Sequence, residues 1–534
     1  MKLRFAASLA MLLAASPACA QAPAVKAGAP KLLIVISVDQ FSAALFDAYR
    51  PHFTGGLRRM ADGVAFANGF QAHAGTQTCP GHAAIMTGGH PARTGVIANY
   101  WYDFAVQRGD KRIYCAEDES VAGSNSEDVS VSATHLRVPT LGDLMKQTWP
   151  TSRVIAVTGK DRTAATMGGR NPDQRWWWQG SRFVQNNAVA PAPVMAQVNG
   201  AVAKAIAEAR PPLAPPAFCA GKDKSYALPD GGSVGTYRFQ RNAGDAAAFG
   251  DGPERDAATL AAAAALVRAM QLGRRNTPDL LAIGLSATDL VGHQFGPGGM
   301  EMCLQLASLD KDLRDFFALL DEDGVDYAVV LTADHGSLDL PERLRVQGVA
   351  DAARLDPAVT PAAIGTEIAR RLQLTTPIFV GDWYLNGNVP QERRPEVLAL
   401  ARQLLSNQPQ VHSVYTKAEI AAHPMPTSAR PESWSVLDRL RASFDARRSA
   451  DLAVIYKPNI STSAVAGHGS LWDYDRKVPI LFWRHGIAAE SRAESAMTVD
   501  IMPTLASLIG MVVPVGSVDG ECLDVTAGVA NNCR

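Results

Sequence analysis

The chain has 534 residues, 47% of them hydrophobic and 19% charged, and its 51 Lys and Arg against 52 Asp and Glu give a formal net charge of −1. So many apolar residues with so little net charge exclude a disordered chain and indicate a folded globular protein. The balanced charge leaves no broad cationic surface, which argues against nucleic acid as a partner. The absence of a repeat period excludes a collagen, coiled coil or solenoid.

The N-terminal residues 1–20 are expected to form an export signal. They have a positively charged start, an apolar core over residues 5–15 and an A-x-A cleavage motif that ends at Ala20. Neither this core nor any later stretch is long and apolar enough to predict a membrane span. Cleavage after Ala20 predicts a periplasmic or secreted protein of net charge −3 (−1 minus 2). Lipidation at Cys19 is the weaker alternative, because Ser16 and Pro17 are unusual residues before a lipidated cysteine.

The cysteines that remain after export are expected to pair. Seven cysteines minus Cys19 leave six, and six can pair in fifteen ways, so the sequence leaves the connectivity open. Cys522 and Cys533 close a short terminal loop and are the best single pair. None of the six forms a C-x-x-C motif, which argues against a thiolate metal cluster. Free buried cysteines are the alternative. The six are Cys79, Cys115, Cys219, Cys303, Cys522 and Cys533.

Three apolar, β-branched runs predict buried parallel strands, over residues 31–40, 279–290 and 326–337. Each run carries an acid near its C-terminal end, the edge where open α/β sheets place their sites. Residues 300–320 have helical periodicity and suffice for a crossover connection. A late strand over 478–484 precedes a helix over about 500–509. The expected fold class is therefore α/β, with a mostly parallel central sheet flanked by helices.

We expect residues 21–534 to form a single catalytic domain with two insertions, over about 100–255 and 340–460. The first stretch is rich in Pro and Gly turns, and its triplet Trp176-Trp177-Trp178 is expected to form the core of the insertion or a lid rather than a base-stacking platform. The second stretch holds polar helices and a small αβ unit. Both are interpreted as additions to one core rather than as independent domains.

Acids and histidines follow several of these strands. Parallel strands bring their C-terminal ends to one edge, so residues far apart in sequence can share a site. Three Asp and three His suit Zn²⁺, and six ligands exceed the need of one tetrahedral ion but match two ions about 3.5–4 Å apart. Other first-row metals share these ligands. The candidate metal ligands are Asp39, Asp289, His293, Asp334, His335 and His468.

The local structure of these ligands can also be predicted. Gly292 and Gly296 are expected to give the backbone room to turn around Asp289 and His293, and adjacent Asp334 and His335 need a turn if both are to reach one ion. Taken singly, each ligand has an ordinary explanation as a cap, turn former or satisfied polar residue. The other histidines considered, His73, His82, His90 and His485, are expected to be structural because they lack a paired acid.

The segment Gly75 to His82 precedes a helix-like run. Pro80 suits a first helical turn and places Thr78 at or just before the N-cap. A helix start offers unpaired N–H groups and partial positive charge to a phosphoryl anion. No general-base histidine is evident beside the Thr78 hydroxyl, so it can act as a nucleophile only if a cation such as zinc lowers its pKa. Taken alone, Thr78 is a helix cap.

Together these motifs resemble those of the alkaline phosphatase superfamily, in the order found in its phosphodiesterase/nucleotide pyrophosphatase-like branch. The resemblance covers about residues 31–510. It implies an alkaline-phosphatase-like sandwich with insertions and two Zn²⁺ ions as cofactors. It implies Thr78 as nucleophile and as a ligand of one zinc together with Asp39, Asp334 and His335, and it gives the second zinc to Asp289, His293 and His468. The motifs are Asp39, Thr78-Cys79-Pro80-Gly81-His82, Asp289-x-x-x-His293, Asp334-His335-Gly336 and Gly467-His468-Gly469.

Three further residues are expected to bind the substrate. Asn99 resembles the asparagine that donates to a phosphoryl oxygen in that branch, and Lys160 and Arg162 resemble the Lys-x-Arg pair of its Thr-nucleophile bacterial alkaline phosphatases. A phosphate monoester is a dianion, so its extra terminal oxygen gains from charge-assisted contacts. In an extended segment, residues i and i+2 face the same side, which would direct Lys160 and Arg162 to one phosphoryl group. A solvated surface pair is the alternative.

The sequence thus predicts an exported two-zinc alkaline phosphatase that acts on a broad range of small phosphate monoesters through a phospho-Thr78 intermediate, with a monomer favoured. A phosphodiesterase or nucleotide pyrophosphatase on the same scaffold is the first alternative. A sulfatase is disfavoured because Cys79 directly precedes Pro80 and His82 replaces the arginine of C/S-x-P-x-R. A non-catalytic exported protein that binds phosphate or metal is the alternative of another class.

Overall fold

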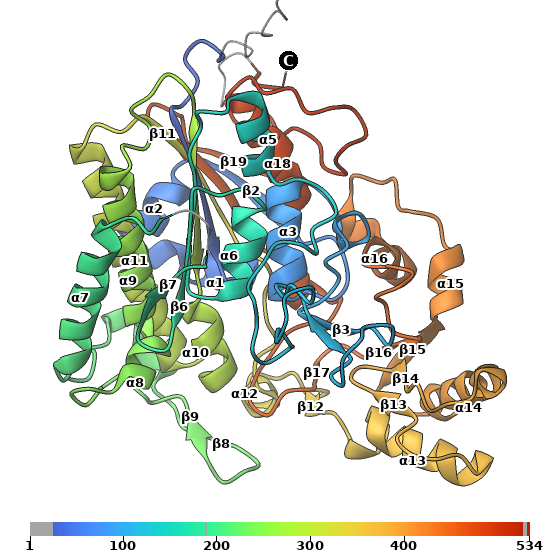
Figure 1. Ribbon diagram of the computed structural model, residues 1–534. Helices are drawn as coiled ribbons and strands as arrows, with labels where there is room; N and C mark the ends of the chain where they lie inside the picture. Colours follow the sequence, from blue (N-terminus) through green and yellow to red (C-terminus); the bar gives the residue numbers. More distant parts are fainter. Residues whose placement is uncertain (1–24, 187–189, 527–530, 534) are drawn as a thin grey trace, which may run out of the picture.

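The computed structural model describes residues 25–186, 190–526 and 531–533, so the expected export signal lies outside the described residues. A nine-stranded sheet with helices on both faces forms its centre (Figure 1). The strands lie in the order β19-β2-β18-β11-β1-β10-β5-β6-β7. Their bounds are β1 Leu32–Val38, β2 Val64–Phe70, β5 Val154–Thr158, β6 Gln174–Gln179, β7 Arg182–Val184, β10 Asp279–Leu285, β11 Tyr327–Thr332, β18 Ile480–Arg484 and β19 Glu490–Met497.

Five neighbouring strands, from β11 through β1, β10 and β5 to β6, pair in parallel. Strand β18 runs antiparallel to both β11 and β2, and β7 runs antiparallel to β6. The mostly parallel sheet confirms the predicted fold class. The three apolar runs form β1, β10 and β11 as predicted, and the late strand is the antiparallel β18.

The continuous apolar sequence of β1 follows from its burial on both faces. Leu32, Ile34 and Ile36 pack into one apolar cluster, whereas Leu33 and Val35 pack into another on the opposite face. The first face is covered by α1 Ala43–Tyr49, α2 Gly56–Ala61, α7 Val194–Ala207, α9 Pro253–Ala269 and α11 Met300–Glu322. The second is covered by α3 Thr78–Thr87, α5 Leu141–Thr148, α6 Asp161–Gly168 and α18 Ile501–Leu508 (Figure 1).

The first expected insertion needs correction, because β5, β6 and β7 lie within 100–255 and belong to the central sheet. Trp176, Trp177 and Trp178 are consecutive residues of β6 and are 5–6% exposed, so they belong to the core of the sheet rather than to an insertion or a lid. The smaller elements of this stretch are β3 Tyr100–Tyr102, β4 Arg112–Tyr114, β8 Tyr226–Ala227, β9 Ser233–Val234 and α8 Ala246–Gly250.

Residues 340–460 form a lobe with an apolar cluster of its own, built around Ile368, Val397 and Leu452. The lobe projects from the side of the molecule in Figure 1, and it contains the predicted small αβ unit, in which two helices accompany the antiparallel pair β15 and β16. Its elements are α12 Pro341–Val346, β12 Ala353–Arg354, α13 Pro361–Leu372, β13 Phe379–Val380, β14 Tyr384–Leu385, α14 Arg394–Ser406, β15 Val411–Thr416, α15 Lys417–Ala422, α16 Val436–Ala442 and β16 Leu452–Tyr456.

Three disulfides join the six predicted cysteines. Cys522 pairs with Cys533 as predicted. The other two bonds join Cys79 to Cys115 and Cys219 to Cys303. The first of these ties the start of α3 to the end of the β3–β4 hairpin, and the second ties the segment before β8 to α11. Cross-links of this kind are typical of proteins that fold in an oxidising compartment.

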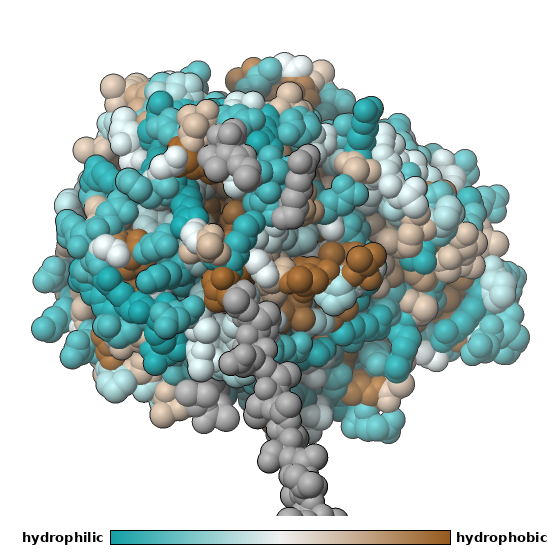
Figure 2. Space-filling model, turned by 90° about the horizontal axis from the view of Figure 1, so that it is seen from above, coloured by the Kyte–Doolittle hydropathy of each residue, from teal (hydrophilic) through white to brown (hydrophobic). Residues whose placement is uncertain are grey.

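Hydrophilic residues cover most of the face seen in Figure 2, and apolar residues form small groups among them. The most exposed large apolar side chains, Val512 and Val515, lie in the loop that follows α18. Among the described residues, no helix combines the length and apolar character that crossing a bilayer requires.

Candidate active site

The six predicted metal ligands come from different parts of the fold and meet at the carboxyl edge of the parallel strands. Asp39 directly follows β1, and Asp334 and His335 form the predicted turn after β11. His468 lies in a loop that precedes β18. The turn predicted around Asp289 and His293 is wrong, because both residues lie in helix α10, Ala287–Phe295, where positions i and i+4 share a face.

The six side chains form two adjacent groups. In one, the His335 Nε2 atom lies 3.5 Å from a carboxylate oxygen of Asp39 and 3.4 Å from one of Asp334. In the other, Asp289 Oδ1 lies 3.2 Å from His293 Nε2 and 3.5 Å from His468 Nε2. The groups adjoin each other, because the rings of His335 and His468 stack with centroids 3.6 Å apart.

The histidine rings are oriented so that Nε2 faces the carboxylates in all three cases. Each Nδ1 lies against a backbone carbonyl: His293 at 3.2 Å from Ala466 O, His335 at 3.0 Å from Gly336 O and His468 at 2.7 Å from Thr76 O. A carbonyl can only accept, so each Nδ1 carries the proton and donates, and each Nε2 is left with a lone pair.

These lone pairs fit bound cations. The Nε2 atoms of His293 and His468 lie only 3.1 Å apart. In the other group, Asp39 Oδ1, Asp334 Oδ2 and His335 Nε2 are buried acceptor atoms without a hydrogen-bond partner. Buried acceptors that face one another are costly unless a proton or cation lies between them. The donor set of three carboxylates and three imidazoles therefore fits divalent metals such as zinc.

Burial shapes the ionisation of the ligands. Burial lowers the pKa of His335 to about 3 and that of His468 well below its usual value, so both imidazoles are neutral, as metal ligation requires. Burial, together with nearby Asp39, raises the pKa of Asp334 well above the ordinary value. Burial also opposes ionisation of Asp289, but the Lys160 ammonium and the two neighbouring imidazoles hold its pKa well below the usual range.

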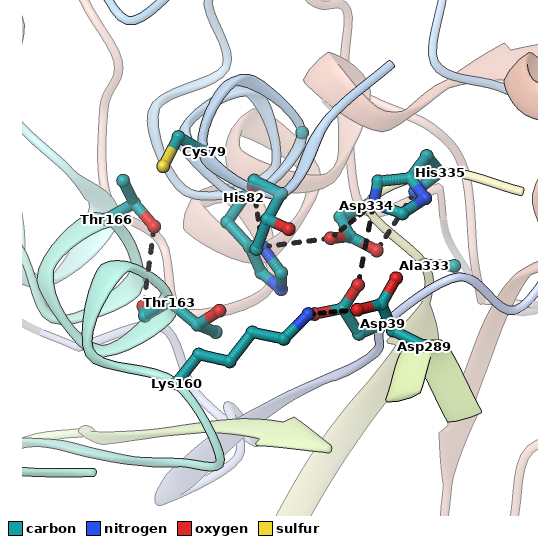
Figure 3. Close-up of polar contacts among 12 residues, drawn as sticks. Asp39, Cys79, His82, Lys160, Thr163, Thr166, Asp289, Ala333, Asp334 and His335 are labelled. Carbon is teal, nitrogen blue, oxygen red and sulfur yellow. Dashed lines mark hydrogen bonds and ion pairs between the residues drawn. The ribbon is translucent and has the colours of Figure 1, made fainter. Parts of the chain in front are cut away.

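Lys160 extends into this cage of acids, where its ammonium group pairs with carboxylates of both groups (Figure 3). Its Nζ atom lies 2.6 Å from Asp39 Oδ2 and also donates to Asp289. The extended segment predicted around Lys160 and Arg162 is wrong: Lys160 is the N-cap of α6, and Arg162 lies in the first turn of that helix. Lys160 nevertheless reaches the acids of the site, and the Asp39 carboxylate contributes to the raised pKa of Arg162.

Thr78 lies at the start of α3, and residues on either side of it contact segments of both groups of ligands. Gln77 is the N-cap and Thr78 is the first helical residue, so the helix begins slightly earlier in the sequence than predicted. The carbonyl of Thr76 holds His468, and a Cβ atom added to Gly81 would lie 2.3 Å from the backbone oxygen of Asp334. This close approach explains the glycine, and it presses the first turn of α3 against the ligand turn.

Asn99 is fixed by three hydrogen bonds to the segments around it. Its Oδ1 atom accepts from Cys79 N at 2.9 Å, and its own N–H donates to Gln77 Oε1 at 2.7 Å. Its carbonyl accepts from Cys115 N at 2.9 Å. The first bond fixes which end of the amide is the oxygen and leaves the NH₂ group to donate elsewhere.

Arg162 is held by Tyr114. The Tyr114 hydroxyl lies 3.5 Å from Arg162 Nη1 and donates to Asp161 Oδ1 at 2.7 Å. Burial opposes the charge of Arg162, but Tyr114, Asp161 and Asp39 outweigh it and raise the pKa of the guanidinium. Its Nε atom is a buried donor without a hydrogen-bond partner, which is a position suited to an anionic ligand.

Two residues of the site escaped prediction. His82, expected to be structural, has an acid beside it: its Nδ1 atom lies 2.8 Å from Thr78 O and 3.3 Å from Asp334 Oδ2 (Figure 3). Gln40 donates from its side chain to Asp289 at 2.9 Å and from its backbone to Asp334 at 3.1 Å. Gln40 also has φ of 66°, a strained value for a residue with a side chain, but a glutamine after a strand gives no signal in sequence.

The comparisons with known proteins agree with this geometry. The model of the type I phosphodiesterase / nucleotide pyrophosphatase family matches residues 33–486, so the chain belongs to this family. The chain is 48% identical over 528 residues to alkaline phosphatase PhoK of a Sphingomonas species, covering 96% of this chain and 94% of the relative. It is 42% identical over 518 residues to alkaline phosphatase PhoD of Zymomonas mobilis, covering 94% and 89%.

A solved structure shows the same fold. The wild-type alkaline phosphatase PafA aligns with a TM-score of 0.80 at 24% identity, covering 94% of this chain and 99% of that one. The family match over residues 33–486 confirms the resemblance to the phosphodiesterase/nucleotide pyrophosphatase-like branch that was inferred from the motifs.

Proposed function

We propose that this chain is an alkaline phosphatase that hydrolyses a broad range of small phosphate monoesters, with two zinc ions as cofactors and Thr78 as the nucleophile. The carrying observation is the convergence of six acids and histidines into two adjacent groups, with unpaired acceptor atoms directed inward, beside the start of α3. The similarity to alkaline phosphatases PhoK and PhoD supports the choice of a phosphomonoesterase within the family.

Asp39, Asp334 and His335 would hold one zinc ion together with Thr78, and Asp289, His293 and His468 would hold the other. His335 also lies close enough to Asp289 and His468 to bind an ion together with them. The two groups are therefore near enough to hold a pair of neighbouring ions. When bound, zinc supplies positive charge that lowers the pKa of a hydroxyl and stabilises the departing oxygen.

The chain's own residues perform the transfer. The Thr78 hydroxyl loses its proton to solvent and its oxygen forms a bond to phosphorus, while the bond from phosphorus to the ester oxygen breaks and the departing alkoxide takes a proton from water. Water then attacks phospho-Thr78, which releases phosphate and restores the hydroxyl. Neutral His82 donates through Nδ1 to the carbonyl of Thr78 and fixes the first turn of α3 during both steps.

The non-bridging oxygens meet three donors. The Asn99 NH₂ group and the Arg162 guanidinium bind the phosphoryl group, and Lys160 completes the set. Its present carboxylate partners would serve the cations, so its ammonium group is left to pair with the substrate. Two cations favour a monoester dianion over a diester, which carries one charge and has a second substituent where these residues bind.

The test combines metal analysis with initial rates on an aryl phosphate monoester and on the matching methyl aryl diester. We expect about two zinc ions per chain and higher kcat/KM for the monoester. Thr78→Ala should abolish turnover, while Thr78→Ser retains part of it. A wild type that stays inactive with zinc loaded would favour a non-catalytic binding protein instead. Full activity in Thr78→Ala would refute covalent catalysis.

The family description favours one second candidate, a phosphodiesterase or nucleotide pyrophosphatase. It predicts that Lys160→Ala and Arg162→Ala leave diester cleavage intact. A diester preference of about 100-fold or more in kcat/KM, equivalent to about 2.7 kcal/mol, would establish this alternative. We further propose export to the periplasm or the medium. The three disulfides support it, and detection of the mature chain in the periplasmic fraction tests it.

A further inference from the structure

The Cys79–Cys115 disulfide lies beside the nucleophile. Cys79 directly follows Thr78 in the first turn of α3, and Cys115 directly follows β4, so the bond joins the nucleophile helix to the β3–β4 hairpin. The two cysteines are 0% and 2% exposed. They pack in one apolar cluster with Trp101 of the hairpin and Ala164 of α6.

Both halves of the disulfide also hold Asn99. The N–H of Cys79 donates to the Asn99 side-chain oxygen at 2.9 Å, and the N–H of Cys115 donates to the Asn99 carbonyl at 2.9 Å. Asn99 directly precedes β3, which pairs with β4 from Tyr100 to Tyr102. The covalent bond therefore closes a ring in which the substrate-binding amide is attached on one side to α3 and on the other to β4.

The residue before Cys115 reaches the third element of the site. Tyr114 is 4% exposed, and its hydroxyl contacts both Asp161 and Arg162 in the first turn of α6. The hairpin thus contacts Cys79, the residue next to Thr78, through the disulfide, the backbone of Asn99 through Cys115 and the guanidinium of Arg162 through Tyr114.

We propose that the β3–β4 hairpin, fixed to α3 by the Cys79–Cys115 disulfide, is a positioning unit that sets the distances among the Thr78 hydroxyl, the Asn99 amide and the Arg162 guanidinium. The inference rests on the proposed roles of these three residues. None of the hairpin's own residues needs to touch the substrate. Tyr114 and the two cysteines act through Arg162 and Asn99, and the covalent bond prevents the hairpin from shifting relative to the helix that carries the nucleophile.

The physical reason is that donors and nucleophile stand on different elements. Thr78 is carried by α3, Arg162 by α6 and Asn99 by the loop before β3, so no single backbone segment fixes their spacing. Displacements of about 1 Å in a reacting group can cost about 100-fold in rate. A covalent link one residue from the nucleophile restricts the motion of Asn99 relative to α3, and the hydrogen bond to the Tyr114 hydroxyl restrains Arg162.

The first experiment compares two disulfide deletions. In Cys79→Ala/Cys115→Ala we expect kcat/KM for the aryl monoester to fall by about 10- to 100-fold. The matched control is Cys219→Ala/Cys303→Ala, which removes an equally buried disulfide at α11 and should keep kcat/KM within about 3-fold of wild type. Both variants are assayed with zinc loaded and well below their melting temperatures, so that lost stability does not enter the rate. Equal losses in the two variants would overturn the inference.

A double-mutant cycle distinguishes positioning from a general structural role. If the disulfide acts through Asn99, its removal in an Asn99→Ala background should change kcat/KM by less than about 3-fold. A second cycle combines Tyr114→Phe with Arg162→Ala and keeps the disulfide intact. This cycle still tests the proposal if the cysteine variant fails to fold. Additive effects in both cycles would refute the proposal. A wild type without phosphatase activity would refute the proposed function instead, whereas an active wild type with additive cycles refutes only the positioning unit.

Discussion

Substitution of Asp256 by Asn tests how the fold stabilises α10, the helix that carries two of the proposed metal ligands. Asp256 lies in α9, is 1% exposed and accepts hydrogen bonds from the N–H groups of Ser286 and Ala287 at 2.8 and 3.0 Å, at the start of α10. Gln305 donates to its second oxygen at 3.0 Å. Asparagine keeps the shape and one acceptor oxygen. In the wild type, the side-chain oxygen of Gln305 lacks a hydrogen-bond partner. In the variant, the Gln305 amide can flip so that this oxygen accepts from the NH₂ group of the new asparagine.

The expected effect is a pH-dependent gain in stability. Burial raises the pKa of Asp256 from 3.8 to about 7, although the two backbone N–H groups act in the opposite direction. The folded wild type therefore binds more protons than the unfolded chain, and its stability falls as pH rises from about 4 to about 7. Each pKa unit corresponds to about 1.36 kcal/mol, so the full loss approaches about 4 kcal/mol. Asp256→Asn avoids this loss and should equal the wild type at pH 4 but exceed it by up to about 4 kcal/mol at pH 8.

Urea unfolding of the zinc-loaded wild type and variant at pH 4.5, 6 and 8 measures this difference. The comparison requires equal m-values, so that the shift in midpoint reports stability alone. Glu367→Gln is the control, because Arg370 and Arg371 lower the pKa of the Glu367 carboxyl to about 2. The contribution of Glu367 to stability therefore rises with pH, whereas that of Asp256 falls. A difference between Asp256→Asn and wild type that stays constant across this pH range would refute the reasoning.

Three further predictions concern metal binding, a helix N-terminus and close packing. Chelation should abolish activity and lower the melting temperature, and added zinc should restore both. A free metal concentration of about 100 times the Kd contributes about 2.7 kcal/mol of stability per ion. Calorimetry with and without chelator measures this change. Asp310→Ala should lower the free energy of unfolding by about 2–4 kcal/mol in urea titrations, because Asp310 accepts from the N–H groups of Thr54, Gly55 and Leu57 at 2.7–2.8 Å. Gly81→Ala should lower zinc content and kcat/KM while a folded chain is retained by circular dichroism, because its Cβ would lie 2.3 Å from Asp334 O.

The sequence allowed the fold class and the convergence of the six candidate ligands to be predicted for the same physical reason. Strands β1, β10 and β11 are buried on both faces, so they are continuous apolar runs that stand out from their surroundings. Five of the six candidate ligands come shortly after these strands, and parallel pairing brings them to one edge, whereas His468 comes from the loop before β18. The prediction that they converge therefore needed no knowledge of the connecting segments.

The missed features depend on contacts between distant segments. Whether Asp289 begins a turn or a helix depends on Asp256, which accepts from the start of α10 from thirty residues away in the sequence. The sequence predicts a structural role for His82 because no acid is near it along the chain, yet Asp334 lies 3.3 Å from it across the fold. The triplet at Trp176 has the bulk and apolar character of any core segment, so only its pairing with β5 shows that it belongs to the central sheet.

Buried acids outside the two ligand groups explain how such distant ligands are held in register. A side-chain oxygen of Asp475 accepts at 2.8 Å from the N–H of Ser470, which lies two residues after His468. The backbone carbonyl of Asp475 accepts at 2.7 Å from the N–H of Gly336, which directly follows His335. Burial raises the pKa of Asp475 to about 7, just as it raises that of Asp256. Ionising such carboxyls is costly, and both acids hold segments that carry candidate histidine ligands. The fold therefore gives up stability at these acids to fix loops and helix starts that sheet pairing does not reach, and residues outside the two groups hold the candidate ligands in place.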